Sequence, residues 1–134
     1  HREVKLAYEK GLQIALENQI SDRLIDLYDG LASVSIDLNE LLSAKRYIAL
    51  TDKRLSFYLE RDKKEVETYF NITKAKYYLA LKDDEKSEKY YRDAIAIASS
   101  IEHRKVADLR ADLAQLYLRS NRKEEAIAQL TKII

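Results

Sequence analysis

The sequence predicts an all-α protein, and three observations support that prediction. The 134 residues include no proline and only two glycines, the residue types on which hairpins and sharp turns depend. Apolar residues recur at spacings of three and four almost throughout, which is the period of an α-helix. The links between these periodic stretches are short and leave no room for a linker, so we expect one helical domain.

Each helix is predicted from its apolar stripe and from the polar residues that precede it. Ser21 or Asp22 can cap the second helix, and Asn39–Glu40 separates it from the third. A charged segment around Arg61 precedes the fourth, and Asp83–Asp84 opens the fifth. The last two links are Glu102–His103 and Ser120–Asn121. The predicted helices are about 3–18, 24–38, 40–60, 62–81, 84–100, 104–119 and from 122 to the end.

The charge balance and the missing residue types exclude several classes of function. Lys plus Arg number 24 and Asp plus Glu 23, so a net charge of +1 gives no electrostatic case for nucleic acid or an anionic membrane. No apolar run approaches the ~18 residues of a membrane span, and no targeting segment is recognised. Without cysteine there is no disulfide and no thiolate, which fits a reducing compartment such as the cytoplasm. An extracytoplasmic sensor region remains the alternative.

Residues capable of catalysis are scarce. The two histidines, His1 and His103, have no second His or Cys with which to hold a metal, and His103 is expected to be exposed near a helix start. No glycine-rich phosphate loop or nucleophile motif occurs. The acidic pairs at Asp83–Asp84 and Glu124–Glu125 open helices, where negative charge complements the helix dipole. We therefore expect no enzyme activity, no cofactor and no metal site.

The helices repeat about every forty residues. Small residues return in alternate helices at spacings of 40, 43 and 39 residues, at Val4, Ala44, Ser87 and Ala126. Bulky residues follow four positions later at Tyr8, Ile48, Tyr91 and Leu130. The intervening helices carry alanine in one frame, at Ala32, Ala75 and Ala114. Such a period is typical of helix pairs that stack, because one pair cannot bury its apolar face alone.

This pattern resembles the tetratricopeptide repeat. The last unit fits best, with Ala114 and Tyr117 in the first helix, a polar turn at 120–122 and Ala126 in the second. The family's usual proline is absent and the period exceeds the usual 34, so each second helix is expected to be longer. Long-period variants occur in bacterial signalling proteins. The resemblance implies an α-α superhelix, with a half repeat at 1–20 and repeats at about 21–61, 62–102 and 103–134, expected to be a fragment of a longer protein.

The resemblance also implies a concave groove built from the first helix of each pair. The implied groove residues are Asp26, Asp29, Ser33, Asp37, Tyr69, Ile72, Lys76, Asp108, Asp112, Gln115 and Arg119. The family's best-known clamp for a peptide carboxylate uses basic residues, and the matching positions here are mostly acidic. The expected function is therefore a protein-interaction module for a peptide with basic residues. The alternatives are a regulatory input domain of a bacterial signalling protein and a merely solvated polar face.

Several further expectations follow from the positions that residues occupy in the repeat. Tyr8, Tyr78, Tyr91 and Tyr117 fall at core positions, which argues against a nucleic-acid stacking surface, while Tyr69, Tyr77 and Tyr90 are freer to be exposed. Lys74 stands where an apolar residue is expected, so its side chain should extend along its neighbours. The half repeat should leave an apolar face on helix 3–18 uncovered. That edge is a predicted contact surface for a second copy of the chain.

Overall fold

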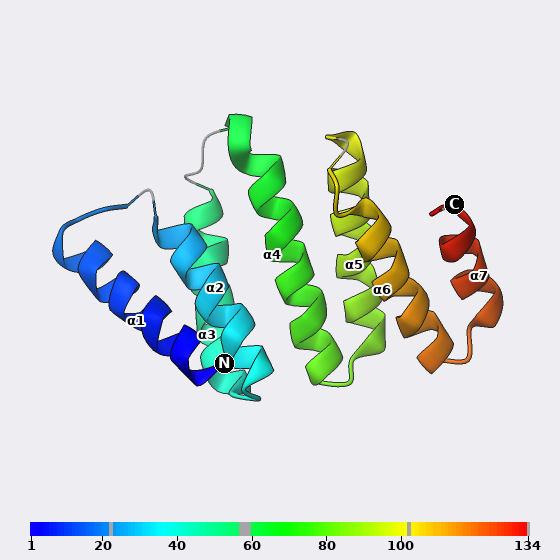
Figure 1. Ribbon diagram of the computed structural model, residues 1–134, viewed down its shortest axis with the longest axis horizontal. Coiled ribbons are helices and arrows are strands. Elements are labelled where there is room, and N and C mark those ends of the chain that lie inside the picture. The colour runs from blue at the N-terminus through cyan, green and yellow to red at the C-terminus, as the bar shows by residue number, and fades with distance from the viewer. Residues whose placement is uncertain (22, 57–59, 102, 134) are drawn as a thin grey trace. The chain divides into compact units, whose positions relative to one another are not determined.

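The computed structural model describes residues 1–21, 23–56, 60–101 and 103–133, and the regular elements within these ranges are all helices (Figure 1). The all-α prediction is thereby confirmed, and the helices lie close to their predicted ranges. They are α1 (Arg2–Glu17), α2 (Leu24–Asp37), α3 (Leu41–Leu55), α4 (Glu60–Ala80), α5 (Asp84–Ser100), α6 (Val106–Arg119) and α7 (Lys123–Thr131). The prediction that the third helix continues to Glu60 is wrong, because α3 ends at Leu55 and Glu60 begins α4. Residues 57–59 lie outside the described residues.

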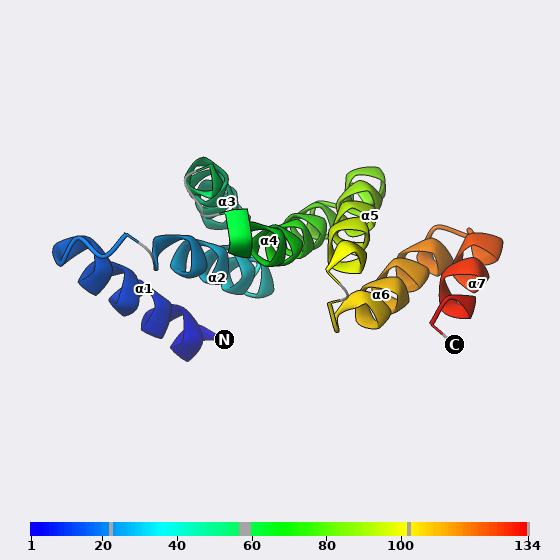
Figure 2. The ribbon, with the colours of Figure 1, turned by 90° about the horizontal axis from the view of Figure 1, so that it is seen from above.

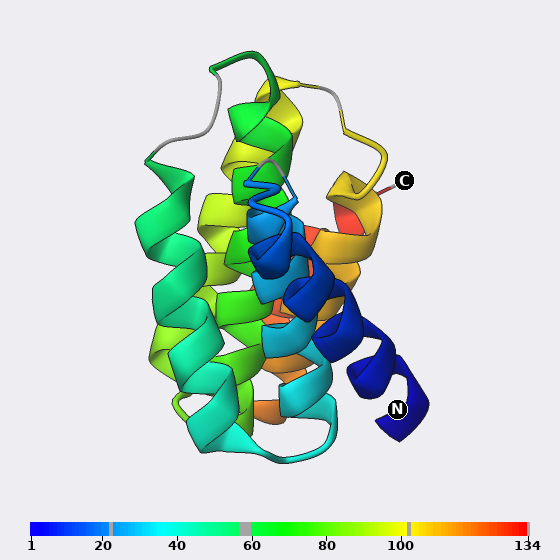
Figure 3. The same ribbon diagram turned by 90° about the vertical axis from the view of Figure 1, so that its left-hand side faces the viewer.

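The chain forms two compact units, residues 1–59 with α1 to α3 and residues 60–134 with α4 to α7. In the first unit α2 lies between α1 and α3 (Figure 2), and α1 crosses α2 at an angle (Figure 3). In the second unit each helix packs antiparallel against the preceding one. Each unit has its own apolar core. The division into one half repeat and three whole repeats stays a prediction.

The small residues of the repeat lie where helices pack most closely. Side chains at the predicted small positions are at most 1% exposed, namely Ala32, Ala75, Ala114, Ala44, Ser87 and Ala126. The Ser87 hydroxyl donates a hydrogen bond of 2.8 Å to the carbonyl of Ala75, which ties α5 to α4. Val4, the first member of the series, is 49% exposed because no described helix covers that face of α1. The expected uncovered face on the first helix is therefore present.

The predictions for the tyrosines are only partly correct. Tyr91 and Tyr117 are buried as predicted, while Tyr8 and Tyr78 are half-buried. The prediction for Tyr77 is wrong: its side chain is buried and its ring packs edge-on against Tyr78, with 5.2 Å between ring centroids. Tyr77 directly precedes the core position Tyr78, and the register does not predict the ring contact between the two. Lys74 behaves as expected, since its Nζ lies 4.4 Å from the ring centroid of Phe70.

A residue in the left-handed conformation ends the first helix of each pair. Asn39, Lys82 and Asn121 have φ angles of 58°, 62° and 61°. The next backbone N–H donates to a carbonyl five residues earlier, in the bonds Glu40 to Ser35, Asp83 to Tyr78 and Arg122 to Tyr117. This is the Schellman cap, usually built on glycine. The chain thus makes its sharp turns without glycine or proline.

The capping prediction at the second helix is wrong for the residue that the structure describes. The N-cap of α2 is Arg23, and no side chain of the described residues caps this helix. Ser21 instead accepts a backbone hydrogen bond from Leu24 through its carbonyl, at 3.3 Å. Asp22 lies outside the described residues. At α5 an acidic residue caps the helix, because the Asp83 carboxylate accepts from the backbone N–H of Lys86 at 3.1 Å.

Candidate functional site

In the first unit, one face of α2 carries the predicted groove residues Asp26, Asp29, Ser33 and Asp37, which follow one another at spacings of three and four. Asp26 and Asp37 are exposed, and Asp29 and Ser33 are half-buried. We call this set the α2 acidic face. Asp37 Oδ2 lies 3.7 Å from His1 Nδ1 in a largely exposed pair.

A different acidic residue, Glu40, links two helices of the first unit. Its carboxylate accepts two hydrogen bonds from Lys5 Nζ, at 2.8 and 3.1 Å, across from α1 to the start of α3. Arg2 lies 3.4 Å from the same carboxylate. The hydrogen bond from Lys5 holds the pKa of Glu40 below its usual value. Glu40 therefore has a structural role. The α2 acidic face lies on a different helix from Lys5 and Glu40.

A cleft of about 360 Å³ lies between α1 and α2 and reaches one end of the α2 acidic face. We call it the α1–α2 cleft. Apolar side chains line most of it, and Asp26 lines it as well. Sequence reasoning did not anticipate this cleft. Its only signal in the sequence is Gly11, which lies at a position where a side chain would narrow the space.

In the second unit, Lys76 of α4 and the acidic residues of α6 come close to one another. Burial raises the pKa of Asp112, the charge of Lys76 lowers it, the charge of Asp108 raises it, and Lys105 lowers it, with a net raised value. The side chains of Lys76, Asp108, Asp112 and Gln115 are all exposed. We call this surface of α6, with Lys76, the α6 acidic face. Asp108 and Asp112, four residues apart on α6, carry like charges, while Lys76 and Lys105 lie near enough to Asp112 to lower its pKa.

Tyr69 is held by contacts within the second unit. The rings of Tyr69 and His103 pack edge-to-face with 5.6 Å between centroids. His103 Nδ1 accepts from the backbone N–H of Lys105 at 3.1 Å, and Nε2 lies 3.7 Å from Glu65 Oε1. The expectation of an exposed His103 is wrong, since its side chain is 11% exposed. It packs against α4 and accepts a backbone hydrogen bond at the start of α6, which the sequence does not reveal.

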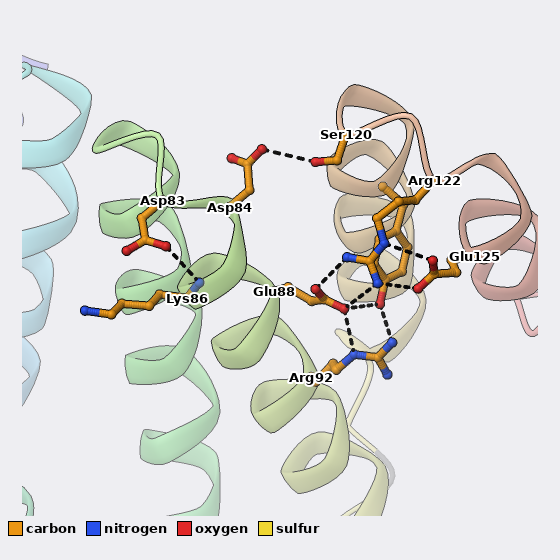
Figure 4. Close-up of polar contacts among 9 residues, drawn as sticks. Asp83, Asp84, Lys86, Glu88, Arg92, Ser120, Arg122 and Glu125 are labelled. Atoms are coloured by element: carbon orange, nitrogen blue, oxygen red, sulfur yellow. Dashed lines mark hydrogen bonds and ion pairs between the residues drawn. The ribbon is translucent and has the colours of Figure 1, made fainter.

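Two other predicted groove residues also have structural contacts. Ile72 is half-buried and packs against the core of the second unit. Arg119 pairs with Asp84 at the start of α5, and the Ser120 hydroxyl donates to the same carboxylate at 3.1 Å. Figure 4 shows Ser120 pointing toward Asp84. Of the predicted residues in this unit, Lys76, Asp108, Asp112 and Gln115 are the exposed ones without such contacts among the described residues.

Glu88 is the centre of a charged network that joins α5 to α6 and α7 (Figure 4). It accepts from the Tyr117 hydroxyl at 2.8 Å, from Arg122 at 2.7 and 3.1 Å, and from Arg92 at 3.2 Å. The hydrogen bond from Arg122 is the largest cause that lowers the pKa of Glu88, to about 2. Arg122 also pairs with Glu125. These carboxylates hold the helices together and are not available to a ligand.

The described residues contain no group of three or more His, Cys, Asp or Glu side chains placed to hold a metal ion. Within the same residues, every helix is too short or too polar to cross a membrane. The chain was also compared with known proteins. A model of the tetratricopeptide repeat matches residues 66–134, which cover most of α4 and all of α5 to α7. No curated protein matches the chain.

Proposed function

The chain belongs to the tetratricopeptide repeat family, and we propose that it is a non-enzymatic interaction module that binds a basic segment of a partner protein along its acidic faces. Helical repeats of this type expose continuous surfaces on which other proteins bind. The proposal applies to the α2 acidic face of the first unit and to the α6 acidic face of the second unit, each taken by itself as a binding surface.

The unpaired carboxylates of the two faces differ from the structural carboxylates, and this difference supports the proposal. Glu40, Glu88 and Glu125 each have a Lys or Arg partner, and each has a pKa lowered mainly by that partner. Asp26, Asp108 and Asp112 form no ion pair with any described residue. An unpaired carboxylate beside a like charge favours an incoming cation, because the cation relieves the repulsion.

The chemistry of the partner follows from these charges. A Lys or Arg that approaches Asp112 would stabilise its charged form, which burial and Asp108 disfavour. An acidic segment would meet the opposite effect. A short peptide of alternating Lys and Ser is therefore the appropriate probe, with alternating Glu and Ser as its negative counterpart.

The experiment compares charge reversal on and off the proposed surface. Asp108→Lys with Asp112→Lys should weaken binding of the Lys–Ser peptide by roughly tenfold, because each lost attraction is about 0.5–1 kcal/mol at an exposed site. The matched control is Asp52→Lys with Glu9→Lys, two exposed carboxylates outside both faces, which changes the net charge equally. Equal weakening by the two double variants would place the effect in the net charge and remove the case for the α6 acidic face.

A further inference from the structure

The α1–α2 cleft has both an apolar lining and unpaired charges. Tyr8, Ile14, Ile20 and Leu27 supply most of the apolar lining. Ile14 and Ile20 are 47% and 40% exposed, so large apolar side chains face solvent there. A single open cleft of about 360 Å³ has room for one large side chain of a partner.

Both glycines of the chain shape this cleft. Gly11 lines it, and a Cβ there would lie 3.2 Å from Leu27 Cδ2. Gly30 lies on α2 where a Cβ would come within 2.5 Å of Tyr8 Cε1. The absence of a side chain at Gly30 therefore lets the Tyr8 ring lie against α2 and form part of the lining. A sequence with only two glycines has placed both at this one helix crossing.

Opposite charges at the start of α2 accompany the apolar lining. Arg23 and Asp26 are both exposed, both line the cleft, and neither forms an ion pair within the part of the chain that the structure describes. Asp26 also begins the α2 acidic face. A segment that follows this face and reaches the cleft would meet a carboxylate and an apolar cavity side by side.

We infer that the α1–α2 cleft receives one large apolar side chain of the partner segment, while a Lys or Arg next to that side chain pairs with Asp26. The inference rests on the proposed function, since the segment is the one that follows the α2 acidic face. It adds a specificity element: a basic residue alone binds more weakly, and an adjacent Leu, Ile or Phe is required for full affinity. Arg23 disfavours a second basic residue at the cleft.

The test uses the full chain and short Ser-rich peptides that carry one Lys and one Leu, with Lys before Leu in one peptide and after Leu in the other. Each has one partner peptide with Ala in place of Leu and another with Ser in place of Lys. In the better orientation, the Leu peptide should bind about fivefold or more tightly than the Ala peptide, as expected for partial burial of a Leu side chain. In methyl NMR spectra, the resonances of Ile14, Ile20 and Leu27 should shift.

Two variants that each replace an exposed apolar side chain with serine show where the Leu side chain of the peptide binds. Ile14→Ser should remove the preference for Leu, whereas Leu16→Ser should leave it, because Leu16 is an exposed side chain of α1 that does not line the cleft. Asp26→Asn should reduce the preference for Lys over Ser in the peptide and keep the preference for Leu over Ala. These readouts do not depend on a stability change, since both apolar positions are about half exposed.

Equal binding of the Leu and Ala peptides would overturn the inference, and so would methyl shifts at Leu6 and Leu16 in place of Ile14 and Ile20. If the peptides bind through Lys alone, the cleft is wrong and the acidic faces stand. If Leu is preferred and Lys is not, the apolar part stands and the proposed function loses its support at Asp26. An absence of binding by all of the peptides would overturn the inference as well.

Discussion

The hydroxyl of Tyr117 donates a hydrogen bond of 2.8 Å to Glu88, and this contact joins α6 to α5 at the centre of the charged network. The ring of Tyr117 lies between two guanidinium groups, with Arg122 at 4.4 Å and Arg92 at 5.7 Å from its centroid. A buried aromatic residue, a carboxylate and two cations thus satisfy one another at the contact between consecutive helix pairs.

Removal of the Tyr117 hydroxyl should weaken the second unit. Tyr117→Phe keeps the ring and loses both the bond to Glu88 and the bond that Arg92 donates to the hydroxyl, so the free energy of unfolding should fall by about 1–2 kcal/mol. In a Glu88→Gln background the loss should be smaller, because the charge that strengthens the bond is already absent. Urea unfolding of the two single variants and the double variant measures this coupling, and strictly additive losses would contradict it.

Acid should remove the contribution of Glu88 to the free energy of unfolding. Its pKa is about 2 in the folded protein against an ordinary value of 4.5, so the folded state favours the charged carboxylate. The resulting stability is complete above pH 4.5 and is lost as the pH falls toward about 2. Glu88→Gln should therefore cost on the order of 2 kcal/mol at neutral pH, and the difference from the unmodified chain should shrink through that range.

Urea unfolding at a series of pH values measures this difference. Glu124→Gln is the matched control, because Glu124 is an exposed carboxylate at the start of α7 and has no ion-pair partner among the described residues. Its cost should be a few tenths of a kcal/mol. Stability curves for Glu88→Gln and the unmodified chain that stay parallel down to pH 2 would show that Glu88 does not have its lowered pKa.

Glycine should be favoured over lysine at position 82. Lys82 ends α4 with a φ of 62°, a conformation that costs a residue with a side chain about 1 kcal/mol and costs glycine little. Lys82→Gly should raise the free energy of unfolding by about 0.5–1 kcal/mol. Asn121→Gly should gain less, since asparagine tolerates this conformation better. A loss of stability in Lys82→Gly, measured by urea unfolding, would contradict the assigned turn.

A methyl group at position 30 should disturb the α1–α2 crossing. Gly30→Ala places a Cβ 2.5 Å from Tyr8 Cε1, so the Tyr8 ring must move and the free energy of unfolding should fall by about 1–3 kcal/mol. Tyr8→Leu should reduce that loss because the ring is gone. If Gly30→Ala costs the same with and without the ring, the close approach of Tyr8 to α2 is not the cause.

The sequence was sufficient to predict the helices and the positions at which the helices pack closely. Spacings of three and four identify buried faces, and the repeat register identified Ala75, Ser87 and Ala114 as packing positions that are at most 1% exposed. It could not identify Lys82 as a turn residue, because no turn-forming residue type occurs there. The sequence also could not predict the burial of His103, because that burial depends on Tyr69, a residue distant in sequence.

The sequence predicted only in part which residues of the candidate site are exposed, because some of them are held by side chains distant in the sequence. Asp26, Asp108 and Asp112 lie on exposed helix faces, as the register predicts, whereas Arg119 and Tyr69 are held by Asp84 and His103. The cleft depends on how Tyr8 lies against Gly30 on another helix, which no local pattern encodes. The alternative role as a regulatory input domain, a contact between two copies of the chain and the compartment stay predictions.

We propose that each of the two acidic faces, that of α2 and that of α6, binds a basic segment. The most direct measurement is an amide NMR titration of the full chain with the Lys–Ser peptide, compared with the Glu–Ser peptide. We predict shifts for Asp26, Asp108 and Asp112 and their neighbours on those faces with the basic peptide alone. Shifts confined to α3 and α7, or equal shifts with both peptides, would contradict the claim.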